Sequence, residues 1–161
     1  MKNVYAVFKK GRPISDFMWL NSLDRIKGLK HNETYNSFYF AITFCSLIKE
    51  QIMQNIHREL THANFFSLSM DGSTDASSKE QESLFVRWCK EGKISSHFLC
   101  IGEPESTSAD NLLAFVFDKI RATGMFEMLT SKLVGFAADG AANMMGNKTG
   151  LATQLKAQYL L

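Results

Sequence analysis

The chain has 161 residues, a length that suits one domain with a hydrophobic core. Hydrophobic residues make up 45% and charged residues 21% of the sequence, a composition that excludes a largely disordered chain. The formal net charge of +2 is too small to indicate nucleic-acid binding by itself.

The basic side chains are concentrated near the amino terminus. Residues 1–30 contain seven Lys and Arg against two Asp, which gives this stretch a net charge of +5. A short basic arm can contact phosphate groups, so DNA is one expected partner. A solvated terminal segment explains the same composition without any partner, and we prefer that interpretation.

Three cysteines, Cys45, Cys89 and Cys100, are widely spaced and include no C-x-x-C pair, so no zinc site is indicated. We expect them to pack as small buried side chains in a reducing compartment. Neither a signal peptide nor an apolar run of membrane-spanning length is apparent. We therefore expect a nuclear or cytoplasmic protein with no membrane partner, and we expect no small-molecule substrate.

Helices are expected in the first part of the chain. Residues 15–29 have apolar side chains at helical spacing, with Ser15 as a plausible N-cap. A longer helix is expected over about residues 36–61, where apolar residues recur every three or four positions. Residues 1–62 are accordingly interpreted as a basic arm with a helical lead-in of one or two helices.

Strands are expected from Asn64 onward. Residues 65–70 form a short apolar run that ends at Asp71-Gly72, which is typical of a buried strand. Two further strands are expected over residues 83–90 and 93–101, joined by a turn at Glu91-Gly92.

A helix, a fourth strand and a last helix follow. Thr107 to Asp110 resemble an N-cap box, and the apolar residues from 112 to 120 continue it as a helix that Gly124 can end. The sequence predicts another buried strand over residues 133–138 and a final helix over residues 149–160.

The expected order of elements after the helical lead-in is β-β-β-α-β-α, over residues 63–161. This order indicates an α/β fold with a mixed sheet. A right-handed crossover can place the fourth strand parallel to the first, on the side away from the hairpin.

Two aspartates stand out in this topology. Asp71 and Asp139 each follow a buried strand and each precede a glycine. If the two strands are parallel neighbours, their ends lie about 5 Å apart, and two carboxylates there repel unless a cation separates them. Because Mg²⁺ prefers carboxylate and water oxygens, the pair is a candidate metal site. Two Asp-Gly turns that merely cap loops are the alternative.

Two longer stretches carry a family resemblance. Ser69–Asp75 followed by Lys79–Glu82 is similar to the first catalytic motif of hAT-superfamily transposases, and Lys132–Met144 is similar to their second. Other matching positions are Trp19, Leu23-Asp24, Lys27-Gly28-Leu29, Phe85-Val86-Arg87-Trp88 and Gly92-Lys93. The upstream positions resemble the lead-in of transposon-derived proteins of the zinc finger protein 862-like group, and the similarity covers roughly residues 15–157.

This resemblance implies an RNase H-like fold with an Asp-Asp-Glu triad. Asp71 matches the first acid and Asp139 the second, while the family's third acid is a Glu far downstream. Residues 140–161 contain no Asp or Glu. We therefore expect a truncated RNase H-like fold in a transposon-derived, catalytically inactive fragment, with at most weak Mg²⁺ binding and no other cofactor.

Two further acids, Asp75 and Glu82, lie near Asp71 in the sequence. Asp75 is interpreted as a turn or capping residue, and Glu82, at the entrance to the second strand, as a surface residue. Two other functions remain open: a module that binds nucleic acid or protein, and a metal-dependent DNA transposase or nuclease completed by a missing region or a partner chain. We also expect self-association through an exposed edge of the fourth strand.

Overall fold

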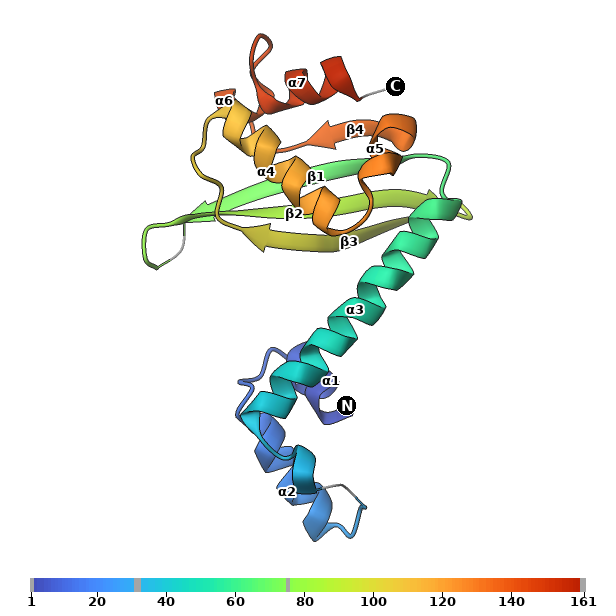
Figure 1. Ribbon diagram of the computed structural model, residues 1–161, viewed down its shortest axis with the longest axis vertical. Coiled ribbons are helices and arrows are strands. Elements are labelled where there is room, and N and C mark those ends of the chain that lie inside the picture. The colour runs from blue at the N-terminus through green and yellow to red at the C-terminus, as the bar shows by residue number, and fades with distance from the viewer. Residues whose placement is uncertain (1, 31–32, 75, 160–161) are drawn as a thin grey trace. The chain divides into compact units, whose positions relative to one another are not determined.

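The computed structural model describes residues 2–30, 33–74 and 76–159, and the side chains of all of these except 33, 129 and 130. The chain divides into two compact units, residues 1–54 and 55–161, and each is described by itself (Figure 1). Helix α3, Phe38–His62, contributes residues to both units. Neither this 25-residue helix nor any other described helix is long and apolar enough to cross a membrane.

The first unit is helical and has a small core. It contains α1 (Lys2–Lys9), α2 (Asp16–Ile26), a single 3-10 turn (Glu33–Tyr35) and the first turns of α3. Four fully buried side chains form its centre, and partly buried apolar residues of α2 and α3 surround them. The four are Val4, Val7, Phe17 and Ala41.

Helix α1 forms where the sequence indicated a basic arm. Val4 and Val7 lie three positions apart and are both 1% exposed, which gives this short helix one apolar stripe. The Nδ2 atom of Asn3 donates hydrogen bonds to Asn21 Oδ1 (2.8 Å) and Asp24 Oδ2 (2.7 Å), and these bonds fasten α1 to α2. In the sequence the apolar residues of α1 form one continuous run, Val4 to Phe8, which shows no helical periodicity.

The second unit is built on a four-stranded mixed sheet in the order β3-β2-β1-β4. Strands β1 (Phe66–Thr74), β2 (Glu80–Lys90) and β3 (Lys93–Gly102) form an antiparallel meander. Strand β4 (Leu133–Ala137) pairs with β1 in parallel. The expected α/β fold with a mixed sheet, and the parallel neighbourhood of the first and fourth strands, are therefore confirmed.

A two-residue turn joins β2 to β3 as the sequence predicts. Glu91 and Gly92 have φ angles of 51° and 75°, the left-handed values of a type I′ turn whose twist matches that of the flanking strands. Lys90 and Lys93 are the last paired residues on either side. Glycine is the residue that adopts this conformation without a steric penalty.

Helix α4 (Ala109–Ala122) covers one face of the sheet (Figure 1). It begins one residue later than the expected box, because Ser108 is the N-cap and its Oγ accepts a hydrogen bond from Asn111 N (3.3 Å). The helix ends before Gly124, which has a φ of 73°. Beneath the helix lies the larger core, to which it contributes Leu112, Phe115, Val116 and Ile120, and the sheet contributes Leu68, Met70, Leu84, Val86 and Leu133.

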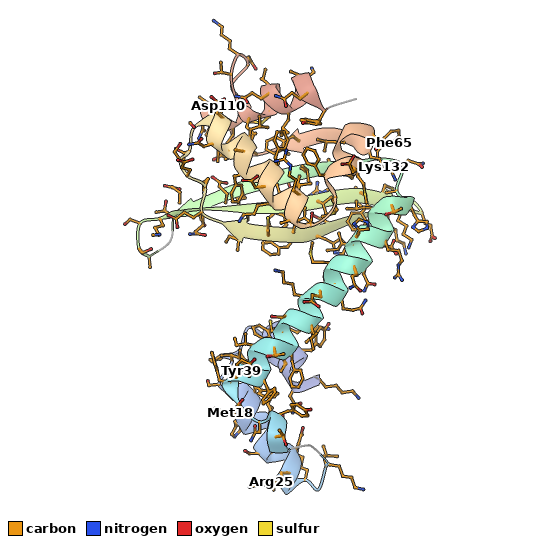
Figure 2. The ribbon with its side chains drawn as sticks, viewed as in Figure 1. Met18, Arg25, Tyr39, Phe65, Asp110 and Lys132 are labelled. Carbon is orange, nitrogen blue, oxygen red and sulfur yellow. The ribbon has the colours of Figure 1, made fainter. Side chains whose placement is uncertain are left out.

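Three shorter helices complete the second unit. Helices α5 (Phe126–Lys132) and α6 (Ala142–Met145) were not expected, since neither is long enough to display helical periodicity. Helix α7 (Leu151–Gln158) confirms the predicted final helix and buries Leu151 and Leu155. Gln154 Nε2 donates to Asp110 Oδ1 (2.7 Å), which joins α7 to the first turn of α4 (Asp110, Figure 2).

One lysine fastens the end of α3 to the start of β4. Lys132 Nζ donates hydrogen bonds to the carbonyl oxygens of Leu60 (3.2 Å), Thr61 (2.7 Å) and Ala63 (2.9 Å). Figure 2 shows Lys132 at the end of the sheet where Phe65 leads into β1. The last carbonyls of a helix have no partner within the helix, and a cation there also interacts favourably with the helix dipole.

The cysteines correct one expectation. Cys45 and Cys100 are half-buried, but Cys89 is exposed. Side chains alternate between the two faces of a strand, and Cys89 follows the buried Trp88 in β2. Its thiol therefore points away from α4, to the face of the sheet that the core does not use.

Candidate metal-binding site

Asp71 and Asp139 lie at the same end of the parallel strand pair. The last paired residues of β1 and β4 are Ser69 and Ala137, and each aspartate is two residues further along its own chain. Parallel neighbouring strands are about 5 Å apart, so this register brings the two residues close to one another. Both side chains are exposed.

The surroundings of Asp71 differ from the expected strand end. Strand β1 does not stop before Asp71 but continues to Thr74. The reason is that β2 begins earlier than the sequence indicated, at Glu80, so that Asp71 pairs with Ser83 and the residues after it also find partners. The backbone at Asp71 is therefore fixed by an antiparallel ladder and is not part of a turn.

Asp139 has the loop environment that the sequence indicated. It follows the end of β4, and its Oδ1 atom accepts a hydrogen bond from the backbone N–H of Ala141 (3.2 Å). This bond across two residues is an Asx-type turn that leads the chain into α6. One carboxylate oxygen thus orients the side chain and the second remains available for another ligand.

Glu82 is a buried residue, and the expectation of a surface position was wrong. Its side chain is 3% exposed, the lowest value for any charged side chain among the described residues. The physical reason is the phase of β2: Glu82 lies on the same face as Leu84, Val86 and Trp88, all of which are buried against the core. The alternation along β2 is visible in the sequence, and extending it by one step would have identified this residue.

A glycine makes room for the Glu82 carboxylate. Glu82 pairs with Gly72 of β1, the residue after Asp71. A Cβ atom at position 72 would lie 2.8 Å from Glu82 Oε1 and 3.1 Å from Oε2, closer than atoms normally approach. The carboxylate therefore occupies the space that a side chain at position 72 would fill.

The charged groups that shift the pKa of Glu82 among the described residues are all acidic. Burial raises the pKa of this carboxyl above its usual value of 4.5, and the negative charges of Asp139, Glu80 and Asp71 raise the pKa further, in that order. One of its oxygens, Oε2, is buried and has no hydrogen-bond partner among the described protein groups. A buried carboxylate without a partner is costly, so the site is better satisfied by a proton or a cation than by the protein alone.

These carboxylates fit a hydrated divalent cation better than a fully protein-ligated one. Among the described residues, no three Asp, Glu, His or Cys side chains are arranged as a ready-made ligand set. Mg²⁺ is commonly held by one or two carboxylates and keeps several of its water ligands. Asp71 and Asp139 supply two carboxylates, and the uncompensated charge of Glu82 favours a cation nearby. Asp75 lies outside the described residues.

A cavity of about 290 Å³ lies at the opposite end of the sheet, between the end of α3 and the β2–β3 turn. Its charged residues already satisfy one another, because Lys90 Nζ lies 2.6 Å from Glu59 Oε2. This hydrogen bond from Lys90 lowers the pKa of the Glu59 carboxyl. Of the two places, the Asp71–Asp139 end of the sheet has the unbalanced charge.

The basic amino-terminal residues are placed on or beside short helices. Lys9 Nζ lies 5.5 Å from the centre of the Tyr5 ring, and Arg12 Nε lies 2.8 Å from Asp16 Oδ2. Both pairs are solvent-exposed and local in sequence. The region remains positively charged, but part of that charge is held by internal contacts.

The mixed sheet, with helix α4 across one face and acidic residues at one end of its parallel strand pair, defines an α/β domain of the RNase-like class. A family model described as DUF4371, ZMYM1/FAM200, RNase-like domain, matches residues 26–150. The chain belongs to this family of RNase-like domains of transposon-derived proteins. The matched residues include all four strands, α4 and both aspartates.

Proposed function

We propose that this chain is a transposon-derived RNase H-like domain, related to hAT-superfamily transposases of the zinc finger protein 862-like group, whose Asp71–Asp139 pair binds a divalent cation. The observation that carries the proposal is the parallel register of β1 and β4, which brings two exposed carboxylates to one end of the sheet. The buried, unpartnered oxygen of Glu82 adds negative charge there.

The proposed role does not include catalysis by these residues alone. A bound divalent cation would neutralise negative charge and polarise a water molecule or a phosphate oxygen. Asp71 is held by the β1–β2 ladder and Asp139 by its hydrogen bond from Ala141, so both carboxylates are positioned before a cation arrives. Phosphodiester transfer also requires the phosphate and a second ion to be placed together, for which the described residues supply no third ligand.

Titration of the purified chain with Mn²⁺ or Mg²⁺ tests this proposal. We expect saturable binding that is lost, or weakened at least tenfold, in both Asp71→Asn and Asp139→Asn, since a tenfold change corresponds to about 1.4 kcal/mol. Asp118→Asn is the matched control, because Asp118 is exposed on α4 and its contact with Arg121 is local (3.5 Å). Binding that survives in either aspartate variant, or that weakens equally in the control, would contradict the proposal.

A second candidate function is a metal-dependent nuclease or transposase that another region or a partner chain completes. The observation that favours it is Glu82, a third carboxylate whose pKa is raised by the charges of both Asp139 and Asp71. Incubation of the chain with labelled single- and double-stranded DNA and Mn²⁺ distinguishes the candidates. Cleavage that Asp71→Asn abolishes supports the nuclease, and intact DNA in the presence of bound Mn²⁺ supports the inactive cation-binding domain.

Contact with nucleic acid through the amino-terminal region is a separate part of the proposal. The seven Lys and Arg among residues 1–30 support it, and its signature is salt dependence, because each neutralised phosphate releases counterions. We expect DNA affinity to fall steeply between low and moderate salt, and to fall less steeply in Lys9→Gln/Lys10→Gln. Binding that is insensitive to salt, or the absence of binding at low salt, would contradict this part.

A further inference from the structure

Glu82 is a buried charged residue whose burial is not accounted for by the proposed role of Asp71 and Asp139. Its side chain is 3% exposed, and its Oε2 atom has no hydrogen-bond partner among the described protein groups. Its neighbours on the same face of β2, Leu84 and Val86, are packed in the core. A leucine at position 82 would continue that core without the desolvation penalty of a carboxylate.

The position of Glu82 relates it to the aspartate pair. Glu82 pairs with Gly72, and the next residue of β2, Ser83, pairs with Asp71. The missing side chain of Gly72 leaves the space that the Glu82 carboxylate occupies. The charges that act on Glu82 are those of Asp139, Glu80 and Asp71, and no basic side chain of the described part of the chain offsets them.

Glu82 is not arranged as a direct third ligand. The described residues contain no ready-made set of three metal-binding side chains. Glu82 is on the α4 face of the sheet together with Leu84. Asp71 pairs with Ser83, the next residue of β2, and side chains alternate along a strand, so Asp71 is on the opposite face. A carboxylate in this place is better suited to accept hydrogen bonds from water molecules than to join the two aspartates on one ion.

We propose that Glu82 is a positioning residue, whose carboxylate accepts hydrogen bonds from the water ligands of a divalent cation held by Asp71 and Asp139. This inference rests on the proposed function, because it assumes that the aspartate pair binds the cation. Carboxylates beyond the direct ligands orient a metal's surroundings, and their removal typically weakens metal binding.

The experiment compares cation affinity and fold stability in the same full-length variants. Mn²⁺ affinity is measured by electron paramagnetic resonance or calorimetry, and unfolding is measured without divalent cations. We expect Glu82→Gln to weaken Mn²⁺ binding about tenfold, the low end of the range for such outer carboxylates. At neutral pH and without cation, Glu82→Gln is expected to be at least as stable as the wild type, since it removes a buried charge. A purely structural residue would not produce weaker binding in a protein of equal or greater stability.

Glu80→Gln is the matched control. Glu80 is an acid of the same strand, it is exposed, and its Oε1 accepts a hydrogen bond from Thr74 Oγ1 (3.1 Å). The same charge is removed from the same end of the sheet, so a general electrostatic effect would weaken both variants equally. We expect Glu80→Gln to change Mn²⁺ affinity less than twofold, and equal losses in the two variants would overturn the assignment to Glu82.

Gly72→Ala provides an independent variant that keeps every charge. Its Cβ would displace the Glu82 carboxylate from its present position, and weakened Mn²⁺ binding is again expected. If Glu82→Gln does not fold, this variant decides the matter. Suppose that wild-type binding depends on Asp71 and Asp139, but that Mn²⁺ affinity is unchanged in a folded Glu82 or Gly72 variant. This result overturns the inference about Glu82 and leaves the proposed function intact. No dependence on the two aspartates overturns both.

Discussion

The two units of this chain achieve burial to very different degrees. Residues 1–54 contain four of the buried core side chains, and residues 55–161 contain nineteen. The exposed large hydrophobic side chains show the reverse distribution among described residues, with twelve in the first unit and six in the second. The net charges also differ, at +4 and −2. The sheet unit therefore has the core of an independent domain, while the helical unit has a small core and leaves much apolar surface in contact with solvent.

The largest expected effect concerns the core of the sheet unit. Leu84 is 0% exposed in the central strand β2, and Leu84→Ala is expected to lower the free energy of unfolding by about 2–5 kcal/mol, through lost burial and a residual cavity. Hydrogen exchange is the suitable measurement, because it resolves both units in one experiment. Amide protection should fall in the strands and change little in α2, and an equal loss in α2 would show that the two units unfold together.

A smaller effect is expected for Lys132, which fastens the last turn of α3 to the start of β4 within the second unit. Lys132→Met keeps the aliphatic stem but removes three hydrogen bonds to carbonyls of residues 60, 61 and 63, and should cost about 1–3 kcal/mol. Urea denaturation measures the loss, with Lys156→Met, on the exposed face of α7, as the control. Equal stability of the two variants would mean that the three hydrogen bonds are replaced by water without cost.

Among the described residues the sheet unit, unlike the helical unit, contains a buried carboxylate, Glu82, which is expected to make its stability depend on pH. Its folded-state pKa is raised, chiefly by burial, so the folded state binds the proton more tightly than the unfolded state does. Below about pH 4.5 the Glu82 carboxyl is protonated in both the folded and the unfolded state, so its burial as a charged group costs no stability. As the pH rises above this value, the free energy of unfolding decreases until the carboxyl of the folded state also ionises. Glu82→Gln should flatten this decrease, as measured by urea denaturation between pH 4 and 8 without divalent cations. An unchanged slope would assign the pH dependence to other groups.

The smallest expected effect lies in the helical unit. Arg12 and Asp16 form an exposed ion pair four residues apart, with Nε and Oδ2 at 2.8 Å. Exposed pairs of this kind contribute about 0–1 kcal/mol, so Arg12→Ala should change the stability of α2 by less than about 1 kcal/mol. Hydrogen exchange of the α2 amides at low and high salt measures this contribution. A loss above that range would show that the small core of the first unit depends on its surface charges.

The elements that the sequence predicted well are those with enough residues to display a pattern. Helix α3 has 25 residues with an apolar stripe, and β2 and β3 flank a Glu91-Gly92 turn with left-handed backbone angles. Helices α5 and α6 have seven and four residues, too few for a periodicity, and the apolar residues of α1 form a continuous run, Val4 to Phe8, that shows none. Their formation depends on contacts distant in sequence, such as those of Asn3 with Asn21 and Asp24.

The candidate site was partly accessible from the sequence. The parallel crossover predicted that the residues after β1 and β4 would meet, and the register agrees with that geometry. The strand that continues through Asp71 was not predicted, because its partners Glu80–Ser83 are polar and do not resemble a strand. Burial of Glu82 was missed for the same reason: a polar residue at a strand entrance is usually solvated, whereas this one is in phase with the buried residues of β2 and has space above Gly72.

The long connection between β1 and β4 has a consequence for the order of folding. The β1–β2–β3 meander joins strands that follow one another, whereas β4 pairs with β1 only after α4 and α5 have been traversed, and Lys132 contacts a carbonyl 72 residues earlier in the chain. Distant pairings form slowly, since loop closure costs entropy before any contact compensates for it. Pulse-labelling hydrogen exchange should therefore show β2 and β3 protected before β4. Asp71 and Asp139 are brought to one end of the sheet only through that late pairing, so the proposed cation-binding site is expected to be one of the last features of the chain to form.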